Sequence, residues 1–307
     1  MTPAPDLLPA ELRVLTAVDS EGSFSAAAVR LGLTQSAVSY AVRTVERKIG
    51  AVLFDRGRHG ARPTPAGERA VAHARGVLRM LEVLRADARA AAGSAEGLAT
   101  RIRIAAFRSA AAHLLPTALA RLTARHPGVS ADVAVVRDLG RGSAGEVADG
   151  RADLAIVNLP ARGIPDSARL VSGTLFDEPF VLLHPANHPD PRGLPLINWD
   201  ENCTTPTKRW FAEQDWLPPA TVEVADDSVV LSMVAHGMGM AVVPRLTAAD
   251  APPQVATTDL TGTEPPPTRT VGYVTTAELA RSTAVRDLVR ELRALRPATT
   301  ALETRPR

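Results

Sequence analysis

The sequence predicts an α/β protein made of a helical N-terminal unit, one long connecting helix and a larger two-lobed unit of strands and helices. Three observations indicate this organisation. Two short amphipathic stretches meet at Gly32 within residues 23–50. Apolar residues recur at heptad spacing between residues 70 and 88. From residue 101 onward, apolar runs of strand length alternate with helical periodicity, as in proteins whose helices cover a parallel sheet.

Length and composition indicate how many compact units the chain can form and where its positive charge lies. The 307 residues suffice for two or three compact units, and a hydrophobic content of 45% supports sizeable cores. Residues 1–100 carry 13 Lys and Arg against 10 Asp and Glu, whereas the rest of the chain carries 22 against 23. The small positive excess therefore lies at the N-terminal end, as contact with nucleic-acid phosphates requires.

The first helix is predicted over residues 9–21, with Gly22 ending it. Residues 23–50 predict two further helices joined by a tight turn at Gly32. Ser23 or Ser25 is expected to cap the first of this pair and Thr34 the second, because their hydroxyls accept the free N–H groups of a first turn. A wedge across the turn is expected from Leu31 and Leu33, and a buried stripe on the second helix from Val38, Val42, Val45 and Ile49.

Polar residues occupy the other face of that second helix, towards its N-terminal end. They are Gln35, Ser36, Ser39, Tyr40 and Arg43. Hydrogen-bonding side chains in this position are typical of a recognition helix, whose N-terminal residues meet base edges in the DNA major groove. The alternative is an ordinary helical pair with a polar outer face, since helix-turn-helix patterns are short and recur by chance.

A basic hairpin is predicted after this pair. Phe54 is expected in the core of the small unit, while Gly57 and Gly60 permit a tight turn. The basic or potentially basic residues around it are Arg56, Arg58, His59 and Arg62. Beside a recognition helix they suit a wing that contacts DNA phosphates. A solvated turn in an Arg-rich chain is the alternative.

Residues 65–92 predict one long helix that starts at Pro65. Its apolar seam consists of Ala70, Ala74, Val77, Leu81, Leu84 and Ala88. Such a seam favours pairing with a second helix, and a dimer formed there would set two recognition helices one DNA turn apart, roughly 34 Å. Packing of the seam on its own domain is the alternative. Gly93, Ser94 and Gly97 then indicate a hinge.

The remaining chain predicts two βα units. Strands are expected at 102–107, 129–136 and 154–157, with helices at 110–126 and up to Gly150. The second unit is expected to hold strands near 170–175, 180–183, 222–224 and 240–243, with helices near 207–215 and 228–236. A strand at 270–274 and a helix at 283–295 are expected to return to the first unit. This rhythm predicts parallel sheets with helices outside them.

A ligand pocket is predicted between these two units, because open α/β sheets bind ligands at the carboxyl ends of their strands. Arg108 and Ser109 follow the first strand and suit an anion such as a carboxylate. Cys203, Thr204 and Thr205 precede a helix of the second unit and are expected to face them, together with Asp227. Plain N-capping is the alternative for Ser109, Asp226 and Asp227, and pairing with an acidic neighbour is the alternative for Arg108.

No enzyme is predicted, and no cofactor or metal. The sequence contains no GxSxG, phosphate-loop, HExxH or CxxC motif. His184 and His188 have metal-ligand spacing only on a helix, which Pro185 disfavours. One cysteine fits a reducing compartment, the first ten residues lack the basic start of a secretory signal, and no apolar run approaches the roughly 20 residues that span a bilayer. A cytoplasmic protein is expected.

Residues 11–67 resemble the winged helix-turn-helix of LysR-type transcriptional regulators. The motifs that carry the resemblance are GSFSAAAVRLGLTQSAVS, VERKIGAVLFDR and PTPAG, and VAHGMGMAVVP extends it towards the C-terminus. Ser36 stands where the family usually has Pro. The resemblance implies a linker helix that dimerises and a two-lobed effector domain similar to periplasmic binding proteins. It also implies a homo-oligomer, with a tetramer expected.

The resulting prediction is a regulator that binds promoter DNA and answers to a small molecule. The expected domains are a winged helix-turn-helix at 1–64, a linker helix at 65–92, a hinge at 93–100 and an effector domain at 101–307. Lobe 1 is expected at about 101–164 and 268–300, and lobe 2 at 165–267. By resemblance, Gln35, Ser36, Ser39 and Arg43 read or position DNA, and Arg56, Arg62 and Thr64 contact its backbone or support the wing. Effector contacts are expected near Ser109, Thr204 and Thr205.

Two alternative functions stay open at this point. The first is a redox sensor, because Cys203 precedes a helix whose N-terminus would lower the thiol pKa. Family members that sense peroxide at a broadly similar place use two cysteines, and this chain has no second one to form an internal disulfide. The second alternative is a solute-binding module with a helical N-terminal fusion.

Overall fold

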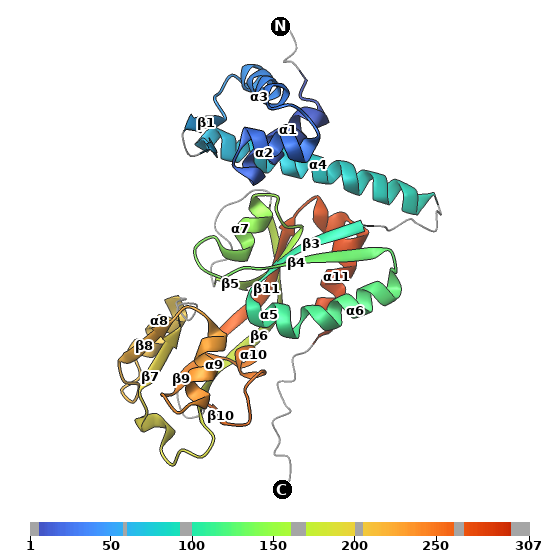
Figure 1. Cartoon of the computed structure of the whole chain (residues 1–307). Coiled ribbons are helices and arrows are strands. Elements are labelled where there is room, and N and C mark those ends of the chain that lie inside the picture. Colours follow the sequence, from blue (N-terminus) through green and yellow to red (C-terminus); the bar gives the residue numbers. More distant parts are fainter. Residues whose placement is uncertain are drawn as a thin grey trace.

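The computed structural model describes residues 6–57, 60–92, 100–160, 170–199, 205–260 and 267–295, without the side chains of 56, 57, 90, 91, 100 and 205–208. Three parts follow one another (Figure 1). They are an N-terminal unit, a linker helix that projects from it, and a two-lobed α/β domain below. No helix among the described residues is long and apolar enough to span a bilayer.

The N-terminal unit consists of three helices and a hairpin: α1 (Pro9–Glu21), α2 (Phe24–Leu31), α3 (Gln35–Ile49), β1 (Phe54–Gly57) and β2 (Gly60–Pro63). Glu11 closes the start of α1 by accepting the Leu8 N–H at 2.9 Å. Ser23 caps α2 and Thr34 caps α3, each accepting the N–H of the third residue along. Gly32 ends α2 in the left-handed region, as the sequence predicts.

The core of this unit is aliphatic, with the ring of Phe54 packed edge-on against Phe24. Val38, Val42 and Val45 are fully buried, so the predicted stripe on α3 is confirmed at three positions. The prediction that Ile49 is buried is wrong. Its side chain is 42% exposed, because it is the last residue of α3 and lies past the turns that pack on the core. The prediction that Leu33 packs between the two helices is also wrong. It lies in the turn and is 47% exposed, whereas Leu31 packs on the core.

The hairpin is fastened to the end of α1. Strands β1 and β2 pair antiparallel with Gly57 opposite Gly60. The Ala61 N–H donates to the Gly22 carbonyl at 2.8 Å. A side chain at Gly60 would place its Cβ 2.3 Å from that same carbonyl oxygen, so only glycine permits this close approach.

The linker helix α4 (Pro65–Ala91) is continuous over 27 residues, close to the predicted bounds. Its first turns belong to the N-terminal unit, because Ala70 and Val71 pack in that core and Ala74 is buried. For Ala70 the structure therefore places the seam against its own domain, and Ala74 is already buried within the single chain. Val77 and Leu84 are exposed, and Leu81 is half-buried. The proposed hinge at 93–100 lies outside the described residues except for its last position.

Lobe 1 is a sheet with helices on both faces. Its elements are β3 (Thr100–Ala106), α5 (Arg108–His113), α6 (Leu115–Arg125), β4 (Val129–Val135), α7 (Gly142–Ala148), β5 (Leu154–Leu159), β11 (Thr268–Thr276), η3 (Leu279–Arg281) and α11 (Thr283–Ala294). Strand β3 pairs parallel with β4 and β5, as predicted. The expected helix at 110–126 is two helices, because Pro116 cannot donate a helical hydrogen bond and starts a new first turn.

Lobe 2 lies at the far end of the domain (Figure 1). It contains η1 (Pro191–Gly193), β7 (Leu196–Trp199), α8 (Thr205–Ala212), β8 (Ala220–Val224), α9 (Asp227–Ala235), β9 (Ala241–Pro244), α10 (Arg245–Ala248) and β10 (Val255–Asp259). Strands β7 and β8 pair parallel, but β9 and β10 run antiparallel to β6 (Leu170–Pro185), which corrects the prediction of all-parallel sheets.

Two long antiparallel strands, β6 and β11, join the lobes. The sequence predicts separate strands at 170–175 and 180–183, but β6 runs through both without a break. Its register with β11 shifts between Val271 and Gly272, where Leu175 is the extra residue on β6. Because β11 also pairs with β5, the predicted return of the chain to lobe 1 is confirmed.

Candidate nucleic-acid interface and inter-lobe site

The N-terminal half of α3 presents a polar surface. Gln35, Ser36 and Arg43 are exposed, Tyr40 is 68% exposed, and Ser39 is half-buried. The Gln35 amide nitrogen lies 3.4 Å from the Ser39 hydroxyl one turn later, so the two side chains form one hydrogen-bonding edge. Among the described residues, Arg43 forms no ion pair, which leaves its guanidinium free to meet an acceptor from outside.

Three hydroxyl residues in the predicted DNA-contact set have structural partners. Ser23 and Thr34 cap their helices. Thr64 donates to the Val52 carbonyl at 2.8 Å and accepts the Gly67 N–H at 3.0 Å, so it fixes the start of α4 against the preceding loop. Ser25 is exposed on the first turn of α2 and is not a cap.

The wing positions are only partly described. Arg62 is exposed on β2, with Asp55 as its register partner on β1. Arg56 lies on β1 but its side chain, like the whole of Arg58, falls outside the described residues. Glu46 holds the loop before the wing, because its carboxylate accepts the Leu53 N–H at 2.8 Å. The wing is thereby fixed to α3.

Between the lobes, Arg108 and Asp227 meet in an ion pair. Arg108 begins α5 of lobe 1, and Asp227 begins α9 of lobe 2 and is buried. Burial acts to lower the pKa of Arg108, but the Asp227 carboxylate, assisted by Asp226, raises it above its ordinary value. Asp226 caps α9 through the Ser228 N–H, whereas Asp227 does not cap. The structure therefore shows the alternative stated above, in which Arg108 pairs with an acidic residue.

A second polar cluster lies behind this pair. Arg269 of β11 is buried, and its Nε lies 2.7 Å from the Glu178 carboxylate on β6. The same guanidinium lies 3.4 Å from the Ser109 hydroxyl and over the Phe107 ring. Ser109 is buried here and does not cap α5.

Asp138 joins this cluster after β4. Its carboxylate accepts the Asn158 N–H at 3.0 Å. Burial raises its pKa above the ordinary value, against the opposing effects of that N–H and of Arg269. Sequence reasoning missed Arg269, Glu178 and Asp138. Arg269 lies between Thr268 and Thr270, and Glu178 follows Asp177, so no local pattern singled out either residue.

The other predicted effector residues lie outside the described part of the structure or are described only in their backbone. Cys203 and Thr204 lie outside the described residues. Thr205 begins α8, but its side chain is not described. The inter-lobe site therefore consists, in the described part of the chain, of residues from α5, α9, β6 and β11 together with Asp138.

Two family models match the chain. A bacterial regulatory helix-turn-helix of the lysR family matches residues 9–68, and the LysR substrate binding domain matches residues 95–296. The chain belongs to the LysR family of transcriptional regulators. It is a regulator and not an enzyme, and the match of the helix-turn-helix model removes the alternative of a solute-binding module.

Individual relatives agree with this assignment. The "Probable HTH-type transcriptional regulator LrrA" of Synechococcus elongatus is 37% identical over 256 residues, which cover 80% of this chain and 84% of the relative. A "Probable hydrogen peroxide-inducible genes activator" of Streptomyces viridosporus is 29% identical over 303 residues, covering 92% and 93%. The structure of a full-length OxyR variant from Pseudomonas aeruginosa superposes with a TM-score of 0.72 at 26% identity, over 94% of this chain and 95% of that one.

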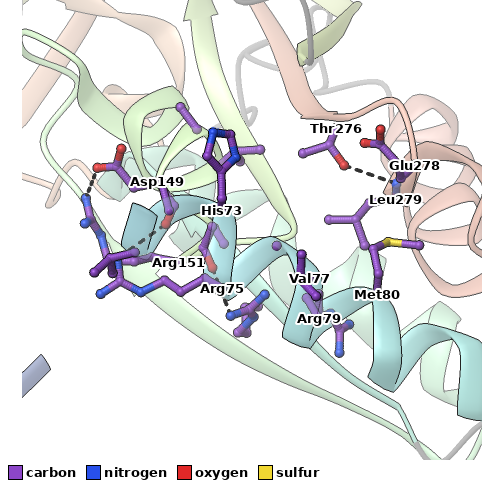
Figure 2. A pocket seen from close by; sticks show the side chains of 18 of the residues that line it. His73, Arg75, Val77, Arg79, Met80, Asp149, Arg151, Thr276, Glu278 and Leu279 are labelled. Atoms are coloured by element: carbon purple, nitrogen blue, oxygen red, sulfur yellow. Dashed lines mark hydrogen bonds and ion pairs between the residues drawn. The ribbon is translucent and has the colours of Figure 1, made fainter. Parts of the chain in front are cut away.

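The linker helix of this LysR-type regulator borders a large cavity. The cavity measures about 1810 Å³ and separates the middle of α4 from lobe 1. Val77 and Met80 face it from the helix, and Thr276 and Leu279 face it from the β11 side (Figure 2). Leu81 and Leu84 also line it. Three of the proposed dimerisation residues therefore border open space in the single chain.

Proposed function

We propose that this LysR-type regulator binds an interrupted palindrome in promoter DNA as an oligomer, with α3 of each subunit in the major groove. The observation that carries the proposal is the polar face at the N-terminal end of α3. Thr34 caps this helix, and three buried valines fix it to the core. Gln35 and Arg43 are side chains that read adenine and guanine edges, respectively, in the major groove. Arg62 on the hairpin would contact the neighbouring phosphates.

Dimerisation through the second half of α4 supports this arrangement. Val77, Met80 and Leu84 follow one another at spacings of three and four residues, so they lie on one helical face. All three are exposed in the single chain. A second copy of α4 would bury them and hold two recognition helices at fixed separation, which half-sites one DNA turn apart require. A tetramer of two such dimers is the larger assembly that we propose.

We further propose that a small molecule binds between the lobes and changes their relation. The residues that support this are Arg108, Ser109, Arg269, Asp138 and Asp227, which gather where α5, α9 and the two crossing strands meet. An anionic effector would compete with Asp227 for the Arg108 guanidinium. Its differential affinity for the two lobe arrangements would set the size of the response.

The direct test is a gel shift followed by footprinting on the DNA upstream of the protein's own gene. We expect a protected palindrome that persists at moderate salt. Binding that is lost at that salt and is indifferent to sequence would contradict specific reading by α3, because phosphate contacts alone are strongly salt-dependent. A selection from genomic fragments would then find any operator elsewhere.

A redox-sensing regulator is the second candidate, because curated relatives from Streptomyces and Mycobacterium carry the name hydrogen peroxide-inducible genes activator. The single cysteine, Cys203, excludes a disulfide within one chain. We expect Cys203→Ser to retain DNA binding and to leave the transcriptional response under peroxide intact. Loss of the peroxide response in Cys203→Ser alone would establish the redox function through a sulfenic acid or an intermolecular disulfide.

A further inference from the structure

A second, smaller cavity on lobe 1 shares no residue with the inter-lobe site. It measures about 270 Å³ and lies between strand β11 and helix α11. Ala280, Val285 and Val289 line it, together with Tyr273. Both valines are buried in the lobe 1 core, so this side of the cavity is apolar and fixed. The volume is that of about nine molecules of liquid water, at roughly 30 Å³ each, which suits a small organic molecule.

Three arginines of α11 line the same cavity. Arg286, Arg290 and Arg293 follow one another at spacings of four and three residues, so they lie on one face of the helix. All three are exposed. Arg290 is partly neutralised, because its guanidinium lies 3.1 Å from the Asp287 carboxylate. Among the described residues, Arg286 forms no ion pair, so its charge is available to a ligand.

The acidic residues of α11 are bonded to another element. Asp287 and Glu291 are buried. Asp287 lies 2.6 Å from the ring of His126, and Glu291 lies 2.6 Å from the guanidinium of Arg125, both at the end of α6. No carboxylate lines the cavity among the described residues. The cavity is therefore cationic on one side and apolar on the other.

Tyr273 holds a hydroxyl beside this cavity in a fixed position. Its ring lies against Gly173, its register partner on β6, where a Cβ would lie 2.6 Å from the ring. The Arg293 guanidinium lies 5.4 Å from the centre of the ring and donates to the hydroxyl oxygen at 3.1 Å. Because that oxygen accepts from Arg293, the hydroxyl proton is available to be donated to a ligand.

We propose that this cavity is a second ligand site, which takes a small monocarboxylate with a short aliphatic or aromatic body. The carboxylate would accept hydrogen bonds from Arg286 and from the Tyr273 hydroxyl, since a charge-assisted bond to a guanidinium is among the stronger ones in proteins. The body of the ligand would lie on Val285 and Val289, as apolar linings with a few placed donors are typical of small-molecule sites. This site would be occupied independently of DNA and of an effector between the lobes.

The test is isothermal titration calorimetry of the full-length protein with phenylacetate and with isovalerate. Phenylacetamide and isovaleramide have the same shapes without the charge and serve as ligand controls. Arg286→Gln removes the unpaired guanidinium, and Tyr273→Phe removes only the hydroxyl. Arg121→Gln, an exposed arginine on α6, is the matched control. Arg108→Gln reports binding at the inter-lobe site instead.

We expect at least one of the two acids to show saturable binding to the parent protein and its amide to bind about tenfold more weakly or less. Arg286→Gln should weaken the acid about tenfold, and Tyr273→Phe about threefold, because a hydrogen bond to a charged group contributes more than one to a neutral group. Arg121→Gln and Arg108→Gln should bind the acid as the parent protein does.

Three outcomes would overturn the second site. They are no saturable binding of either acid to the parent protein, equal binding of the acid to the parent protein and to Arg286→Gln, and loss of binding in Arg108→Gln alone. The last of these would assign the acid to the inter-lobe site. Thermal melts of each variant without ligand show that a loss of binding does not come from unfolding.

Discussion

At the scale of single residues, burial decides what an arginine does in this protein. Arg43 and Arg62 are exposed beside the proposed DNA-contact surface, where a guanidinium can reach phosphates or guanine. Arg79 and Arg269 are buried, and each is bonded to a buried carboxylate. The sequence shows all four as members of one Arg-rich set. Their different roles follow from the partner that the fold brings within hydrogen-bonding distance.

Gln35 is the residue for which base reading is most directly testable. Gln35→Ala should lower specific DNA affinity and spare the fold, because the side chain is exposed and a bidentate contact to a base contributes about 1–3 kcal/mol of discrimination. Fluorescence anisotropy with the operator and with a scrambled duplex measures the difference. Gln254→Ala, an exposed glutamine of lobe 2, is the control. Equal affinities of Gln35→Ala and the parent protein for the operator would remove Gln35 from base readout.

Asp138 is held at a cost to stability at neutral pH. Its folded-state pKa is raised by burial, so the native carboxyl keeps its proton at pH values where the unfolded chain has lost it. The native state therefore loses stability as pH rises from the ordinary pKa, about 3.9, through the folded-state value. We expect Asp138→Asn to raise the melting temperature at neutral pH and to change it little near pH 4.

Asp215→Asn, on the surface of lobe 2, is the control for the Asp138 substitution. It should leave the melting temperature unchanged at both pH values. A lower melting temperature of Asp138→Asn at neutral pH would mean that the ionised carboxylate, bonded to the Asn158 N–H and attracted by the charge of Arg269, stabilises the fold.

At the scale of elements, α4 carries three separate tasks along one helix. Ala70 and Val71 complete the core of the N-terminal unit, Arg79 and Val83 dock on lobe 1, and Val77 and Leu84 remain exposed. At 3.6 residues per turn, Ala70, Val77 and Leu84 lie near one face of the helix, whereas Arg79 and Val83 lie near the opposite face. The heptad seam in the sequence combines the first and third tasks into one line.

Leu84 tests the third task. Leu84→Glu should shift the protein towards monomers, because the side chain is 65% exposed in the single chain and a buried, unpaired carboxylate in a helix pair is strongly unfavourable. Sedimentation velocity over a range of concentrations measures the shift. Val29→Glu, an exposed aliphatic residue on α2, should leave the oligomer intact. Sedimentation of Leu84→Glu identical to that of the parent protein would place the dimer interface elsewhere.

Local signals made most elements predictable, and tertiary contacts explain the misses. Gly22, Gly32 and the cap at Thr34 fix the helix ends from neighbouring residues alone, so α1 and α3 follow from the sequence. The continuity of β6 depends on pairing with β11, which lies about a hundred residues later, and no local pattern reports it. The cluster at Arg269 was missed for the same reason, since Glu178 and Ser109 meet it only after the strands cross.

At the scale of the whole molecule, the two lobes meet through polar contacts with a consistent direction. Lobe 1 supplies the nitrogen groups and lobe 2 the carboxylates. Arg108 pairs with Asp227, and His113 on the same helix lies 3.3 Å from the Asp250 carboxylate. The chain also crosses between the lobes at β6 and β11. We therefore expect closure of the lobes to depend on the charge of a ligand that binds beside Arg108.

Asp227→Asn tests which charge the effector carries. The substitution removes the nearer of the two carboxylates beside the Arg108 guanidinium and leaves Asp226 at 3.9 Å, so carboxylates should bind there more tightly than to the parent protein. Thermal shifts with succinate and citrate at equal ionic strength report this binding, because a ligand that binds the native state raises the melting temperature. Glu213→Gln, an exposed carboxylate of lobe 2, is the control. Larger carboxylate shifts in Asp227→Asn alone would support an anionic effector that displaces Asp227, whereas equal shifts in all three proteins would exclude Arg108 as an anion site.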